Sequence, residues 1–342
     1  MGKYKDTIDD VQTLLGEKSE WKKRYKEYIE TLNCNKAKIM KAIELLNVPE
    51  PFKVYMTISQ AKNATDSSIK FDLRFHGNNV GVLEVDLKSK NVILNKVCEP
   101  VVIKKLINDE KISDELNNMK GCNWNTAQRF HEIYSDLDTR KVTRNKEHEL
   151  ESELLSEFSK RSSKAITQIQ PVRYFDFQSK KSVIFTPMTT PLTACQAKKG
   201  DIDYSGHHGG GIDILARIGH GGPATYLAII ELKDKFEETE LPEDAICQAI
   251  AYATFIRELL RSEGGQDWWN FFGFKGNLPE KLKLYAIIAM PNNVNAIKKF
   301  DYSEDDKKLG ADDVLEIGYI YLKDGNLPLE VSENLPCKVN QN

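Results

Sequence analysis

The chain has 342 residues, of which 40% are hydrophobic and 29% charged, and its formal net charge is −3. This composition is typical of a globular protein with enough length for about two domains. No apolar run approaches the ~20 residues of a membrane-spanning helix, and a mildly acidic chain does not coat nucleic acid through its overall charge.

Two further features predict the compartment. The N-terminal stretch MGKYKDTIDD lacks the apolar region of a secretory signal. The six cysteines are scattered without any C-x-x-C spacing, which argues against a zinc site and against a disulfide framework. We therefore expect a cytoplasmic protein with reduced thiols and no membrane association.

The N-terminal part of the chain predicts an α+β domain. Residues 7–47 carry apolar side chains at spacings of three and four, as in a helical segment that ends before Pro49. Residues 52–96 alternate between apolar and polar side chains with turn residues between them, which predicts an antiparallel meander. Helical patterns return at 101–108 and 126–137.

A basic run without acids follows at residues 140–146. Its side chains could guide a phosphate backbone, and a solvated linker is an equally open interpretation. We place the domain boundary here. Residues 1–140 are then an accessory or recognition domain, and residues 141–342 form a second domain.

The second domain predicts the order helix, three strands, helix, strand. The expected elements lie at 147–158, at 166–174 or 182–188, and at 209–218, 226–235, 243–262 and 282–290. A C-terminal hairpin at 314–331 turns at Asp324 and Gly325. This order predicts an α/β fold with a mixed sheet.

Two apolar strands in this domain flank the turn GHGG at 219–222, which is typical of a hairpin. A symmetric hairpin places Asp213 opposite Glu231, with Cβ atoms roughly 5 Å apart. Lys233 shares their face because it lies two residues beyond Glu231. Opposed carboxylates repel unless a divalent cation lies between them, so this set fits metal-assisted phosphodiester hydrolysis.

Asp213 is followed, after a spacer of about two strands, by the motif Glu231-x-Lys233. This pattern resembles the PD-(D/E)XK nuclease superfamily. The resemblance covers residues 146–291 and implies the restriction-endonuclease-like αβββαβ core. It also implies that Mg²⁺ or Mn²⁺ is bound by Asp213, Glu231 and the backbone carbonyl of Leu232. Lys233 would then orient or activate the attacking water and balance charge on the scissile phosphate.

The acidic helix at 147–158 supplies a further candidate. On a helical wheel, Glu151 and Glu147 fall inside the apolar face, where a carboxylate is costly without a partner. The other glutamates of the helix fall outside this face: Glu149, Glu153 and Glu157. The resemblance implies that Glu151 reaches the metal site, and a solvated acidic helix start is the alternative.

Gln248 and Tyr252 lie one turn apart on the inward arc of the next helix. Gln-x-x-x-Tyr at this place is similar to the nuclease domains of bacterial recombination helicases, where both residues approach the active site. A pair of satisfied core polar groups is the alternative. We interpret the histidine and glycine segment 207–211 as a flexible approach to Asp213. The aromatic residues at 268–274 predict core or domain contacts rather than a base-stacking platform.

The preferred function is that of an enzyme, a Mg²⁺-dependent nuclease that binds DNA and hydrolyses its phosphodiester bonds. The alternative is a catalytically weak or inactive nuclease-fold protein that serves as a nucleic-acid-binding or complex scaffold. A hydrolase of another phosphodiester is a third interpretation. RNA as the substrate, endo or exo action and a homodimer all remain open.

Overall fold

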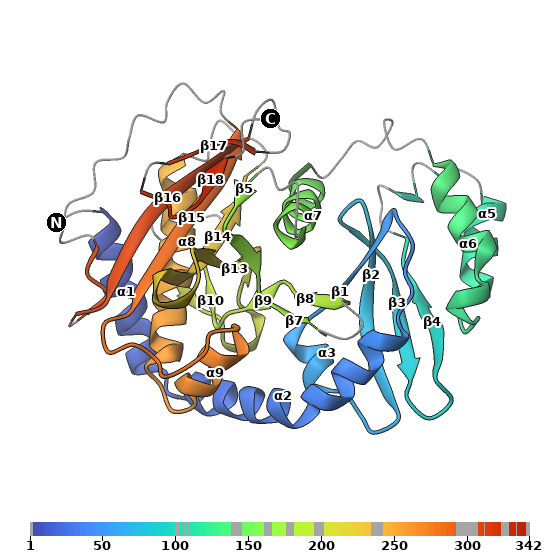
Figure 1. Ribbon diagram of the computed structural model, residues 1–342, viewed down its shortest axis with the longest axis horizontal. Helices are drawn as coiled ribbons and strands as arrows, with labels where there is room; N and C mark the ends of the chain where they lie inside the picture. Colours follow the sequence, from blue (N-terminus) through green and yellow to red (C-terminus); the bar gives the residue numbers. More distant parts are fainter. Residues whose placement is uncertain are drawn as a thin grey trace. The chain divides into compact units, whose positions relative to one another are not determined.

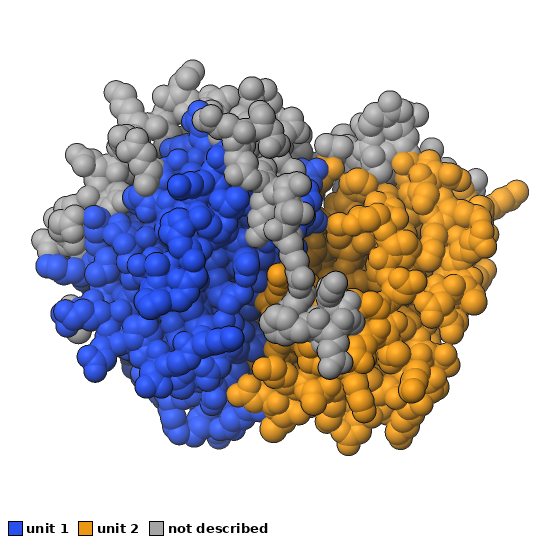
Figure 2. Space-filling view, in the orientation of Figure 1, with its two compact units in different colours: residues 1–30, 153–172, 186–342 blue, residues 31–152, 173–185 orange. Residues whose placement is uncertain are grey.

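The computed structural model describes residues 3–99, 103–104, 107, 110–137, 146–160, 166–175, 181–194, 202–233, 242–291, 307–310, 312–322, 328–332 and 334–339. The chain divides into two compact units, which Figure 2 colours separately. Unit 1 comprises residues 1–30, 153–172 and 186–342, and unit 2 comprises residues 31–152 and 173–185.

Unit 1 contains a six-stranded mixed sheet with the order β17-β16-β15-β14-β13-β6 (Figure 1). The strands are β6 (Ile169–Pro171), β13 (Ile214–Gly219), β14 (Thr225–Leu232), β15 (Lys283–Pro291), β16 (Val314–Leu322) and β17 (Pro328–Val331). Strands β14, β15 and β16 are parallel, and the other pairings in the sheet are antiparallel. Strands β14 and β15 are almost continuously apolar and buried, as expected where both faces of a sheet are covered.

Helices cover this sheet. Helix α8 (Pro242–Leu260) packs on β14 and β15, and α1 (Lys3–Glu17) packs on α8. The first part of α2 (Glu20–Leu45) adds Trp21 and Tyr25, whose rings lie 5.6 Å and 5.1 Å from that of Phe255. Helix α9 (Gly265–Phe271) follows α8 and buries Trp268 against Tyr25.

Short strands complete unit 1. They pair as β5 (Ile166–Thr167) with β18 (Lys338–Val339), β9 (Met188–Thr189) with β12 (Gly211–Ile212), and β10 (Leu192–Thr193) with β11 (Asp203–Tyr204). The turn between β13 and β14 needs glycine. Gly219, Gly221 and Gly222 have φ angles of +130°, +95° and +57°, which side-chain-bearing residues rarely adopt.

Unit 2 contains a second sheet with the order β4-β3-β2-β1-β8-β7. The strands are β1 (Phe52–Met56), β2 (Ser68–Phe75), β3 (Asn78–Asp86), β4 (Asn91–Val97), β7 (Arg173–Phe175) and β8 (Ser182–Phe185). Its helices are α3 (Ile58–Lys62), α5 (Glu110–Asn118), α6 (Gln128–Asp136) and the parts of α2 and α7 (Lys146–Ser159) that belong to the unit. Rings of Phe52, Phe75, Trp124, Phe130 and Tyr134 contact one another in its core.

The expected α/β class and mixed sheet are confirmed. The elements α7, β6, β13, β14, α8 and β15 follow one another in the expected sequence order, with β7 to β12 between β6 and β13 and α9 before β15, so the compact αβββαβ core stays a prediction. The meander at 52–96 and the pairing of the C-terminal hairpin are also found, although Asp324 and Gly325 lie outside the described residues. The helical segment 7–47 is two helices, which break at Lys18 and Ser19.

The domain organisation differs from the expected division of the chain at one boundary. The expected boundary at residue 140 lies outside the described residues, and the compact units are interleaved along the chain. The first 30 residues belong to unit 1, whereas residues 173–185 belong to unit 2 because β8 pairs with β1. None of the helices in the described ranges is both long and apolar enough to cross a bilayer.

Candidate functional site

The hairpin β13–β14 has the register that brings two carboxylates together. Ile214 pairs with Ile230, so the next residues on the two strands are Asp213 and Glu231. Asp213 Oδ2 accepts a hydrogen bond of 3.0 Å from the backbone N–H of Leu232. The expected juxtaposition of Asp213 and Glu231 is therefore found in the structure.

Glu231 lies in an environment that disfavours its charge. Its exposed fraction is 1%, and no described group forms a hydrogen bond with its Oε1 atom. Burial raises the pKa of Glu231 well above its usual value, and the nearby charge of Asp213 raises it further. The ammonium of Lys233 acts in the opposite direction. A buried carboxylate oxygen without a partner is costly, and a bound cation would remove that cost.

Lys233 follows directly after β14. Its backbone N–H donates to the carbonyl of Ala289 at 2.8 Å, which extends the pairing of β14 with β15. Strand alternation places its half-buried side chain on the face of Glu231. The positive charge of Lys233 lowers the pKa of Glu231 and so partly opposes the effects of burial and Asp213.

Thr186 positions Asp213 and was not recognised from the sequence. Its hydroxyl donates to the backbone carbonyl of Asp213 at 2.6 Å, and only 1% of Thr186 is exposed. The two residues are 27 positions apart. Because this contact joins two segments that are far apart in the sequence, no local pattern could have indicated it.

Gln248 and Tyr252 face inward from α8, as expected, with exposed fractions of 7% and 0%. A Cβ atom at Gly210 would overlap the hydroxyl of Tyr252, so this hydroxyl lies against the chain that leads to Asp213. Gly210 also exchanges backbone hydrogen bonds with Thr190 and Leu192, at 2.8 Å and 2.6 Å. Gly210 therefore permits close packing at this point, and the flexibility expected for residues 207–211 stays a prediction.

Glu151 belongs to unit 2, whereas Asp213 and Glu231 belong to unit 1. Arg74 Nη1 donates to Glu151 Oε1 at 3.2 Å, and His148 Nδ1 lies 3.5 Å from Oε2. The hydrogen bond to Glu151 is the main reason that the pKa of His148 is raised. These two partners compensate the burial of Glu151 within its own unit, and its expected role as a metal ligand stays a prediction.

The expected exposure of the other glutamates in α7 is wrong in two cases. Glu149 and Glu157 have exposed fractions of 7% and 2%. Glu157 forms an ion pair of 2.6 Å with Lys160, and Glu149 lies 3.5 Å from His76. The helix is buried on most sides, so a single apolar stripe does not describe it.

Most of the basic run at 140–146 lies outside the described residues. Another basic residue, Lys181, donates to the backbone carbonyls of Glu44 and Leu46, at 2.7 Å and 2.6 Å. Since it satisfies carbonyls at the C-terminal end of α2, Lys181 has a structural role.

The carboxylate pair fits some metals better than others. Within the described part of the chain, no group of three or more His, Cys, Asp or Glu side chains could hold a metal ion. A tetrahedral zinc site therefore has no support there. Mg²⁺ keeps several waters and needs only one or two carboxylates, so the pair of Asp213 and Glu231 is compatible with it.

Comparisons with known proteins add no relative. No protein-family model, curated protein or solved structure matches this chain.

The raised pKa of Glu231 predicts an unusual pH dependence of stability. The unfolded carboxyl ionises near ~4.3, whereas the folded one keeps its proton to higher pH. The folded state then binds more protons, so the stability of the metal-free protein falls as pH rises from about 4.3 to the folded pKa. We expect Glu231→Gln to be more stable than the native protein at pH 8 and equally stable below pH 4.

Urea unfolding across this pH range in EDTA would measure the difference. Saturating Mn²⁺ should reverse the order at pH 8, because only the native protein gains ~2.7 kcal/mol at 100 times the Kd. A variant that is less stable than the native protein in EDTA at pH 8 would contradict the assigned protonation.

Proposed function

We propose that this protein is a Mg²⁺-dependent nuclease of the PD-(D/E)XK type that hydrolyses DNA phosphodiester bonds. The observation that carries the proposal is the paired carboxylates of Asp213 and Glu231, of which Glu231 has a buried oxygen with no hydrogen-bond partner among the described residues. The order α7, β6, β13, β14, α8, β15 supports the restriction-endonuclease-like core that the motif implies.

Each residue of the site has a chemical role in this proposal. Asp213, Glu231 and the carbonyl of Leu232 would hold the divalent cation, which would lower the pKa of a bound water and neutralise phosphate charge. Lys233 holds the attacking water or the scissile phosphate through its ammonium group. The hydrogen bond from Thr186 and that from the Leu232 N–H fix the main chain and the carboxylate of Asp213.

Tyr252 and Gln248 contribute to the same region from α8. The hydroxyl of Tyr252 packs closely against Gly210, so the helix contacts the segment that leads to Asp213. We propose that these two side chains shape the floor of the DNA-binding surface next to the carboxylate pair. This is a positioning role rather than a direct role in bond cleavage.

The test is cleavage of supercoiled, linear and single-stranded DNA by the purified full-length protein, with Mg²⁺, with Mn²⁺ and with EDTA. We expect cleavage that depends on the cation and is lost in EDTA, with RNA as a parallel substrate. Binding of DNA without any cleavage, in both cations, would favour the scaffold alternative. Neither binding nor cleavage of any nucleic acid would reject the proposal.

A further inference from the structure

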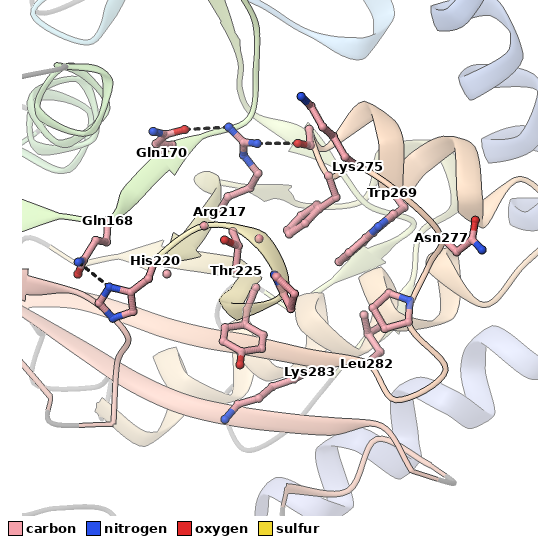
Figure 3. A pocket seen from close by; sticks show the side chains of 18 of the residues that line it. Gln168, Gln170, Arg217, His220, Thr225, Trp269, Lys275, Asn277, Leu282 and Lys283 are labelled. Atoms are coloured by element: carbon pink, nitrogen blue, oxygen red, sulfur yellow. Dashed lines mark hydrogen bonds between the residues drawn. The ribbon is translucent and has the colours of Figure 1, made fainter.

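A pocket of about 920 Å³ lies at the turn end of the β13–β14 hairpin (Figure 3). Its lining comes from β6, from the hairpin residues 217–226 and from the segment 269–283, all within unit 1. Asp213 is at the other end of β13, about 20 Å away at ~3.3 Å per residue. The pocket is therefore separate from the carboxylate pair, and its volume is typical of sites for small molecules.

The arginine and lysine side chains that line the pocket make its lining basic. The lining contains Arg217 and three lysines but no aspartate or glutamate. Lys281 and Lys283 have partners outside it, Asp312 at 3.6 Å and Glu316 at 3.2 Å. Arg217 and Lys275 have no carboxylate within ion-pair distance among the described residues. In a chain of net charge −3, such a pocket selects for an anion.

Arg217 is held in place by neutral groups. Its guanidinium donates to the carbonyl of Gly273 at 2.6 Å and to Gln170 Oε1 at 2.8 Å (Figure 3). Burial lowers the pKa of Arg217, as expected for a cation that is partly removed from water without a counter-charge. An anionic ligand would supply that counter-charge. Gly273 has φ +91°, and a Cβ atom there would press on the guanidinium.

Three polar atoms of the lining are buried and have no hydrogen-bond partner in the part of the chain that the structure describes. They are Gln168 Oε1, Thr225 Oγ1 and Trp269 Nε1. Buried polar atoms are normally paired, so three together in one pocket indicate a ligand with both donors and acceptors. Gln168 also has φ +70°, which is uncommon for a residue other than glycine, and its amide nitrogen lies 2.7 Å from His220 Nδ1.

Aromatic rings provide the apolar part of the lining. Trp269 and Phe274 are stacked, with ring centroids 3.7 Å apart and an interplanar angle of 12°. Phe274 and Tyr226 are half-buried, so each keeps ring surface that a planar ligand could cover. The expected core contacts are found for Trp268 and Trp269, which are both buried, whereas Phe274 is half-buried at the pocket.

We propose that this pocket binds a nucleoside 5′-phosphate, either as a free mononucleotide or as the terminal nucleotide of a strand. Arg217 and Lys275 bind the phosphate, and Phe274 stacks on the base. The polar edge of the base hydrogen-bonds with Gln168, Thr225 and Trp269. This inference goes beyond the proposed hydrolysis and does not depend on it.

Calorimetric titration of the full-length protein in EDTA tests the inference. AMP and GMP are the mononucleotide probes, adenosine and inorganic phosphate are the partial probes, and a 5′-phosphorylated hexadeoxyadenylate is the strand probe. We expect saturable binding of a mononucleotide that is at least tenfold tighter than that of adenosine or phosphate. Tighter binding of the phosphorylated strand would assign the site to strand ends, and equal binding would assign it to free nucleotides.

Two conservative substitutions test whether the mononucleotide binds in this pocket. Thr225→Val keeps the side-chain shape and removes the hydroxyl, and Lys275→Ala removes an exposed charge. Each should weaken mononucleotide binding about threefold to tenfold, as expected for one hydrogen bond or one charge contact. Lys338→Ala, at an exposed lysine of β18, is the matched control and should bind normally.

Two results would overturn the inference. One is the absence of saturable binding of every nucleotide and oligonucleotide at millimolar concentration. The other is binding that Thr225→Val and Lys275→Ala both leave unchanged. Asp213→Asn should bind mononucleotides normally, so a failure of the proposed nuclease activity and a failure of this site can be distinguished.

Discussion

Asp213→Asn should abolish both metal binding and DNA cleavage while the fold is retained. The substitution removes one of two anionic ligands, and loss of the cation costs several kcal/mol of transition-state stabilisation, or roughly 100-fold to 1000-fold in rate. Asparagine is preferable to alanine because Asp213 Oδ2 accepts the N–H of Leu232, and an amide oxygen can keep that bond. Alanine would leave this N–H without an acceptor at a cost of about 1 kcal/mol or more.

Titration with Mn²⁺, urea unfolding and cleavage assays would be made on the same preparations. In EDTA the variant should be at least as stable as the native protein, because one of two opposed charges is gone. Asp203→Asn is the matched control, since Asp203 is an exposed aspartate of β11 in the same unit. Normal Mn²⁺ affinity in Asp213→Asn would remove Asp213 from the ligand set.

The variant Lys233→Met should still bind the cation but should cleave DNA much more slowly. Methionine retains the length of the half-buried side chain while removing the charge that acts on the water or the phosphate. Removal of one such charged group lowers kcat by roughly 100-fold to 1000-fold. Two effects on the affinity for the cation oppose each other. The substitution removes the repulsion between Lys233 and the cation. It also raises the pKa of Glu231 further, so that protons compete more strongly with the cation. We therefore expect the Mn²⁺ affinity to change by less than about tenfold.

Single-turnover cleavage and Mn²⁺ titration separate the two roles. Lys338→Met is the control for removal of a lysine charge from an exposed strand of unit 1. If Asp213→Asn and Lys233→Met lose metal affinity to the same extent, the division between ligand and water-orienting residue is wrong. If Lys233→Met cleaves at the native rate, Lys233 has no part in the reaction.

Local patterns in the sequence were sufficient for the hairpin and for the central geometry of the site. The glycine-rich turn between two apolar strands determines the register of the hairpin, because turn type and loop length set which residues pair. That register places Asp213 beside Glu231 and leaves Lys233 on the same side. The inward direction of Gln248 and Tyr252 followed from helical periodicity in the same way.

Contacts between distant segments were decided only by the tertiary structure. The burial of Glu149 and Glu157 could not be foreseen, because a helical wheel describes one apolar face and α7 is covered on most sides. The hydrogen bond from Thr186 to Asp213 and the overlap that a side chain at Gly210 would have with Tyr252 both join segments far apart in the chain.

Contacts between distant segments also assign the first 30 residues to unit 1. Such contacts bring Gln168, Arg217 and Trp269 together around one pocket. Side-chain periodicity reports which face of an element is buried, and it carries no information about which other element covers that face. The sequence by itself therefore determined the hairpin and its carboxylate pair. Packing between distant segments determined the supports of that pair and the second pocket.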